Sequence, residues 1–158
     1  MDKFTEFWAG IWESEEKTTL QPWMEKVEKK IRAKVTNVKE FIVAESDIAI
    51  IIKQRKNWTA PGIDGIENFW WKIFKSCWRP LSRIMNCWVK EKESIPKWVT
   101  LGKTALLPKS DDLSCETDYR PITCPNTSYK IFTSVLGNYM KEHAMANERW
   151  NQNQIDTV

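Results

Sequence analysis

Lys109 and Arg120 are the two side chains whose types and surroundings best suit an anionic ligand. Pro108 precedes the lysine and Pro121 follows the arginine, so the backbone beside each cation is stiff. Arginine offers a planar fork of donors and lysine a compact charge, which together suit phosphate oxygens. If the two segments are the arms of a strand–loop–strand, the pair could hold a polyphosphate. The alternative is that both are ordinary solvent-facing cations of a hairpin.

A turn between residues 59 and 65 is the second distinctive feature of the sequence. Its turn-forming residues are Pro61, Gly62, Asp64 and Gly65. Proline and glycine interrupt regular structure, so we expect this segment to be a turn. Asp64 and Glu67 have the spacing of a capping box, which predicts that a helix begins directly after the turn.

Other catalytic patterns are incomplete. The four cysteines, at positions 77, 87, 115 and 124, form no Cys-x-x-Cys pair, and His143 is the single histidine. This argues against a structural zinc site. Gly102, Lys103 and Thr104 match the end of a phosphate-binding P-loop, but Lys97 occupies the position of its first glycine. We therefore interpret Lys103 as a surface charge.

The remaining polar candidates have simpler explanations. Asp111 and Asp112 are adjacent carboxylates in a polar segment without an acidic partner nearby, which is typical of a solvated turn rather than a two-metal site. His143 is expected in the last turn of a helix, where the helix dipole favours a cation. We expect no metal ligand among these side chains.

Tryptophan is unusually frequent, with ten residues in 158. Such side chains need a core, a partner surface or further sequence to cover them, and exposed ones could stack nucleobases. Helical spacing predicts that Trp70, Trp78 and Trp88 lie in the core, together with Cys77, and that Trp71 is the better candidate for exposure.

Hydrophobic periodicity predicts a mostly helical α+β protein with one short antiparallel strand pair. The expected helices span residues 1–16, 22–35, 47–55 (capped by Ser46 and Asp47), 66–78, 80–94 and 127–146, and the expected strands 104–107 and 122–123. Two strands alone are marginally stable, so we expect the sheet to continue elsewhere. Residues 148–158 show no packing pattern and are expected to form a frayed tail.

The net charge of +3 and the ordinary apolar fraction of 42% are typical of a globular protein and do not by themselves indicate nucleic acid. No charged-then-apolar leader opens the chain, and no apolar run approaches about 18 residues. We therefore expect an intracellular protein of the cytoplasm or nucleus, with reduced thiols and no membrane partner.

Three motifs in order resemble the amino-terminal part of the reverse transcriptase of non-LTR (LINE-like) retrotransposons. Residues 57–66 are similar to the family's Ala-Pro-Gly-x-Asp-Gly-Ile turn, and residues 104–109 to its first fingers strand. Residues 119–123 and 128–132 resemble its second fingers motif and the helix that follows. The resemblance covers residues 57–143 and is weaker over 1–56. It divides the chain into a helical extension (1–56), a fingers fragment (57–146) and an unpacked tail (147–158).

The resemblance implies part of a right-hand polymerase. Lys109 and Arg120 match fingers residues that contact the triphosphate of the incoming deoxynucleotide. The turn of Pro61, Gly62, Asp64 and Gly65 matches the fingers base near the RNA template. Polymerisation by the complete enzyme would require Mg²⁺.

The sequence departs from the family because the palm is missing. The family's catalytic aspartates lie beyond the last matching helix, and no aromatic-x-Asp-Asp motif occurs among the 158 residues. We therefore expect no catalytic or metal-binding residue here, and no RNA-directed DNA polymerase activity from this chain alone. The alternative is a decayed or exapted module without enzymatic activity, which binds nucleic acid weakly or contacts another protein.

Overall fold

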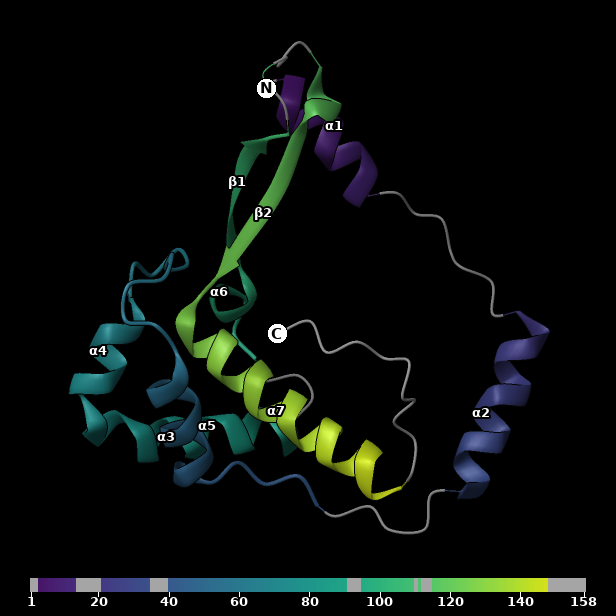
Figure 1. Ribbon diagram of the computed structural model, residues 1–158, viewed down its shortest axis with the longest axis vertical. Helices are drawn as coiled ribbons and strands as arrows, with labels where there is room; N and C mark the ends of the chain where they lie inside the picture. Colours follow the sequence, from purple (N-terminus) through teal and green to yellow (C-terminus); the bar gives the residue numbers. More distant parts are fainter. Residues whose placement is uncertain are drawn as a thin grey trace. The chain divides into compact units, whose positions relative to one another are not determined.

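The computed structural model describes residues 3–13, 21–34, 40–90, 95–109, 111 and 115–147 (Figure 1). It is mostly helical, with one antiparallel pair of strands, which confirms the predicted α+β class. The helices are α1 (Lys3–Trp12), α2 (Pro22–Lys34), α3 (Glu45–Gln54), α4 (Asn68–Ile73), α5 (Trp78–Lys90), α6 (Lys97–Thr100) and α7 (Thr127–Ala146), with 3₁₀ turns η1 (Lys75–Cys77) and η2 (Glu116–Asp118). The strands are β1 (Gly102–Pro108) and β2 (Tyr119–Pro125).

The chain divides into two compact units, and the division falls within the strand pair. The first unit comprises residues 1–37 and 105–122, and therefore holds α1, α2 and the end of the hairpin. The second comprises residues 38–104 and 123–158 and holds the remaining helices. None of the described helices is both long and apolar enough to cross a membrane.

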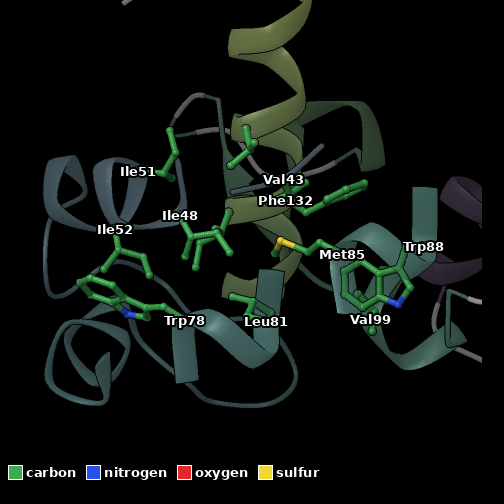
Figure 2. Packing of buried hydrophobic residues seen from close by; sticks show 12 residues of the cluster. Val43, Ile48, Ile51, Ile52, Trp78, Leu81, Met85, Trp88, Val99 and Phe132 are labelled. Carbon is green, nitrogen blue, oxygen red and sulfur yellow. The ribbon is translucent and has the colours of Figure 1, made fainter. Parts of the chain in front are cut away.

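The core of the second unit lies where α3, α5 and α7 meet. Ile48 and Ile52 from α3, Met85 from α5 and Ile131 from α7 are fully buried. Figure 2 shows Met85 in the middle of this cluster. Each of these residues belongs to a stripe of apolar side chains at helical spacing on its own helix. Burial of one such stripe per helix holds the unit together.

The segment before α3 is fixed by α5. The side chain of Asn86 accepts a hydrogen bond from Val43 N and donates one to Val43 O, both at 2.9 Å. α3 begins at Glu45, and Asp47 Oδ2 accepts a hydrogen bond from Ala44 N at 2.9 Å. The prediction that Ser46 caps this helix is wrong, because the carboxylate of Asp47 satisfies the free backbone donor instead.

The predicted helix over residues 66–78 is broken at Phe74, whose ψ of 64° is not helical. α4 therefore ends at Ile73, a 3₁₀ turn follows, and α5 begins at Trp78 rather than at the predicted Pro80. The apolar stripe loses its register at this break. Cys77 is exposed, contrary to prediction, while Trp78 stays buried.

The expectation for two tryptophans of α4 is reversed. Trp70 is 45% exposed, whereas Trp71 is half-buried against the core, and its carbonyl accepts a hydrogen bond from Trp78 Nε1 at 2.7 Å. The predicted burial of Trp78 and Trp88 is confirmed. Ile84 of α5 is 48% exposed.

The strand pair and α7 agree best with the sequence. α7 spans the predicted residues 127–146, and both strands are longer than predicted. The expected capping of a helix by Asp64 and Glu67 is wrong: α4 begins later, at Asn68, and Glu67 makes no side-chain cap. The expected tail at 148–158 and the carboxylate of Asp112 lie outside the described residues.

Candidate nucleotide-binding site

Two hydrogen bonds define the register of the hairpin. Lys109 N donates to Asp118 O at 2.7 Å, and the hydroxyls of Thr104 and Thr123 lie 2.8 Å apart. Both place the same residues opposite one another, so Arg120 on β2 lies opposite Leu107 on β1. Side chains approach this closely at a pair without backbone hydrogen bonds between the strands, so Thr104 and Thr123 form such a pair. Counting along the hairpin from Thr104 and Thr123, pairs without and with backbone hydrogen bonds alternate.

This register explains why the hairpin tolerates three prolines. Pro108, Pro121 and Pro125 all fall at pairs without backbone hydrogen bonds between the strands. The missing N–H of each proline would point away from the partner strand, so no bond of the pair is lost.

Lys109 and Arg120 share one face of the hairpin. Side chains two residues apart on a strand lie on the same face, so Lys109 lies on the face of Leu107. Arg120 is directly opposite Leu107 and lies on that face as well. Every side chain of this face within residues 105–109 and 120–122 is exposed, including Leu107 at 51% and Ile122 at 45%.

The opposite face of the hairpin end is covered by α1. Tyr119, one residue before Arg120, has its ring in edge-on contact with Phe4 of α1, with ring centroids 5.0 Å apart. Leu106 and Pro121 on that face are half-buried. The packing of α1 therefore leaves the face with the two cations open.

The ammonium group of Lys109 is held at the end of the hairpin. Its Nζ donates to Thr117 O at 2.6 Å, which leaves two N–H groups for a ligand. Asp118 lies across from Lys109, but its Oδ2 accepts a hydrogen bond from Cys115 N at 2.9 Å and thereby closes the turn. An ammonium that is already held in place loses little conformational entropy when an anion binds.

The predicted turn at residues 59–65 belongs to the second unit and is joined to the start of α7. Gly65 N donates to Gly62 O at 3.3 Å, and Asp64 Oδ1 accepts from Ile66 N at 3.1 Å. Asp64 N donates to the side chain of Asn126. The turn is thus part of the packing of α7, and its predicted place near a template stays a prediction.

Both glycines of this turn are required by its geometry. A Cβ at Gly62 would overlap Asn126, whose Cα would be 2.6 Å away. Gly65 has a φ of 67°, in the left-handed region that glycine adopts most easily. Pro61 beside Gly62 is half-buried.

The residues at the start of α7 that hold this turn in place were not predicted from the sequence. Asn126 is 1% exposed and donates from Nδ2 to Trp98 O at 2.8 Å. Thr127 Oγ1 donates to Ile66 O at 2.6 Å, and Lys130 Nζ donates to Ala60 O at 2.8 Å. The sequence signal was an asparagine directly before a helix, which is typical of an ordinary cap.

Arg55 was also missed. It ends α3, and its Nη2 donates to Lys130 O at 2.9 Å and to Ser134 Oγ at 2.7 Å on α7. Burial lowers the pKa of this guanidinium from its ordinary value. Its bonds to α7 show a packing role rather than a ligand site.

A cavity in the second unit does not suit phosphate. This cavity, of about 260 Å³ between α3 and α7, has the carboxylates of Asp47 and Glu142 in its wall, which repel anions. Among the described residues, no three His, Cys, Asp or Glu side chains gather where they could hold a metal ion.

No protein-family model matches the chain.

Proposed function

We propose that this chain is the fingers region of a non-LTR retrotransposon reverse transcriptase, in which Lys109 and Arg120 bind the triphosphate of the incoming deoxynucleotide. Three motifs in the family's order support the assignment to that enzyme. The observation that carries the binding role is that the hairpin register puts both cations on one exposed face.

The chemistry of this face is charge neutralisation. Arg120 can form two parallel hydrogen bonds to phosphate oxygens, and Lys109 adds a point charge from the neighbouring strand. The Mg²⁺ and the carboxylates that polymerisation needs would come from the palm, and the RNA template would pass the fingers. These residues bind and orient a nucleotide but do not transform it.

Replacing both Lys109 and Arg120 by alanine tests this role. We expect the unchanged 158-residue chain to bind a deoxynucleoside triphosphate in the millimolar range. Each charge-assisted bond contributes about 1.5–3 kcal/mol, and about 1.4 kcal/mol corresponds to a factor of ten, so the double variant should bind at least tenfold more weakly. Binding is measured by titrating the chain with triphosphate and following the backbone amide signals by NMR.

The matched control is Lys29→Ala with Lys30→Ala on α2, where both lysines are exposed and the same charge is removed. This variant should bind as the unchanged chain does. Tripolyphosphate should compete with the nucleotide, whereas the nucleoside should not. Equal affinities of the two double variants would show that the face of Lys109 and Arg120 is not the site.

A further inference from the structure

An exposed row of four aromatic rings lies in the second unit, outside the hairpin. The ring of Trp58 stacks on that of Phe69, with centroids 4.7 Å apart and planes at 21°. Phe69 contacts Trp70 edge-on at 5.3 Å, and Trp70 stacks on Phe74 at 6.0 Å and 13°. We call these four residues the aromatic row.

Most of the aromatic row faces solvent. Trp58 is 66% exposed, Phe74 52% and Trp70 45%, while Phe69 is half-buried and forms the base. Trp70 lies within α4, and Phe74 is the residue at which the helix ends. Their apolar area is therefore not part of the core.

The aromatic row rests on a fixed backbone. Phe69 N donates to Asn57 O at 3.1 Å, which joins the segment of Trp58 to α4. Asn68, fully buried at the start of α4, donates to Ile52 O at 3.1 Å. A rigid support of this kind preserves the ring geometry and lowers the entropy lost when a flat ligand stacks on it.

Basic residues outnumber acidic ones in the sequence around the aromatic row, where Glu67, directly before α4, is a nearby carboxylate. Lys56 stands two residues before Trp58, Lys72 lies within α4, and Lys75 follows Phe74. No carboxylate occurs between residues 68 and 90, a stretch with five lysines and arginines. Lys72 Nζ is fixed by a hydrogen bond of 2.8 Å to Arg55 O.

We propose that the aromatic row is a binding site for single-stranded nucleic acid, with bases stacked on Trp58 and Trp70 and the phosphates beside the neighbouring lysines. Stacked aromatic rings combined with cations are the usual platform for unpaired bases. Aromatic side chains are also common in protein interfaces, but lysine is depleted from them, so the lysines here favour nucleic acid over a protein partner. The site uses none of the residues assigned to the nucleotide, so it stands or falls separately from the proposed polymerase role.

The test measures binding of a fluorescein-labelled twelve-nucleotide oligo(dT) by anisotropy at low salt. In the variant Trp58→Leu with Trp70→Leu, the apolar character remains but the flat rings are lost, so affinity should fall at least tenfold. Trp58→Phe with Trp70→Phe keeps the rings and should retain most of the binding. The control Trp98→Leu changes a tryptophan that is 60% exposed elsewhere in the same unit, and should alter affinity less than twofold.

An abasic oligomer of the same length separates stacking from charge attraction. The abasic oligomer should bind the unchanged chain more weakly than oligo(dT) does. The leucine variant should bind the two oligomers with equal affinity.

The proposal is overturned if the leucine variant binds oligo(dT) with the same affinity as the Trp98→Leu variant, or if the abasic oligomer binds the unchanged chain as tightly as oligo(dT) does. A leucine variant that keeps oligonucleotide affinity but changes self-association in sedimentation would indicate protein docking and would also overturn it. Unfolding curves compare the folding of the variants, and the phenylalanine variant provides the second comparison if the leucine variant is unstable.

Discussion

Replacing Gly62 by alanine is expected to destabilise the second unit by about 3 kcal/mol, because the added methyl group overlaps the backbone and side chain of Asn126. The backbone of Asn126 cannot move away easily, since it starts α7 and its carbonyl accepts from Lys130 N at 3.0 Å. Urea unfolding followed by tryptophan fluorescence measures the loss as a lower midpoint.

Two other glycines provide controls for this substitution. Gly137 is exposed inside α7 with nothing within 4 Å of an added Cβ, so Gly137→Ala should stabilise the protein by about 0.5–1 kcal/mol. Gly65 also has open space, and Gly65→Ala should cost only the left-handed backbone strain of about 1–2 kcal/mol. If Gly62→Ala lowered the stability no more than Gly65→Ala does, the turn would not be packed closely against Asn126.

Replacing Asn126 by alanine should have the second large effect, a loss of about 2–4 kcal/mol. The substitution removes the acceptor of Asp64 N and the donor to Trp98 O, and it leaves a gap in a site that is 1% exposed. Buried polar groups without partners cost about 1–3 kcal/mol each. The free energy of unfolding in urea measures the effect.

Asn138→Ala is the matched control, since Asn138 is exposed on the same helix and its replacement should change stability by less than about 0.5 kcal/mol. Because Gly62 and Asn126 are in contact, the double variant should lose less than the sum of the two single variants. Strict additivity would indicate that the two residues do not interact.

The sequence predicted best where one helix buries one continuous stripe. α7 has the predicted bounds because its apolar residues keep a single period from beginning to end. The stripe of residues 66–78 looked equally regular, but Phe74 leaves the helical conformation, and side chains beyond it turn to new directions. Periodicity alone cannot show such a break, because the sequence contains no glycine or proline there.

The residues of the candidate sites also include some that the sequence could predict and some that it could not. That Lys109 and Arg120 belong to the two arms of a strand–loop–strand could be predicted from the local pattern of prolines. The role of Asn126 could not, because its side chain bonds two segments 62 and 28 residues away instead of capping its own helix. Long-range partners of this kind become visible only when the elements are assembled.

The prolines of the hairpin also determine where a third strand could join. On the outer edge of β2, Pro121 and Pro125 replace two of the amides that a neighbour would need, leaving Tyr119 and Thr123 as donors. On the outer edge of β1, Gly102, Thr104 and Leu106 keep theirs, and Pro108 stands only at the end. A larger sheet would therefore grow from β1, while β2 is protected from unwanted pairing with other chains.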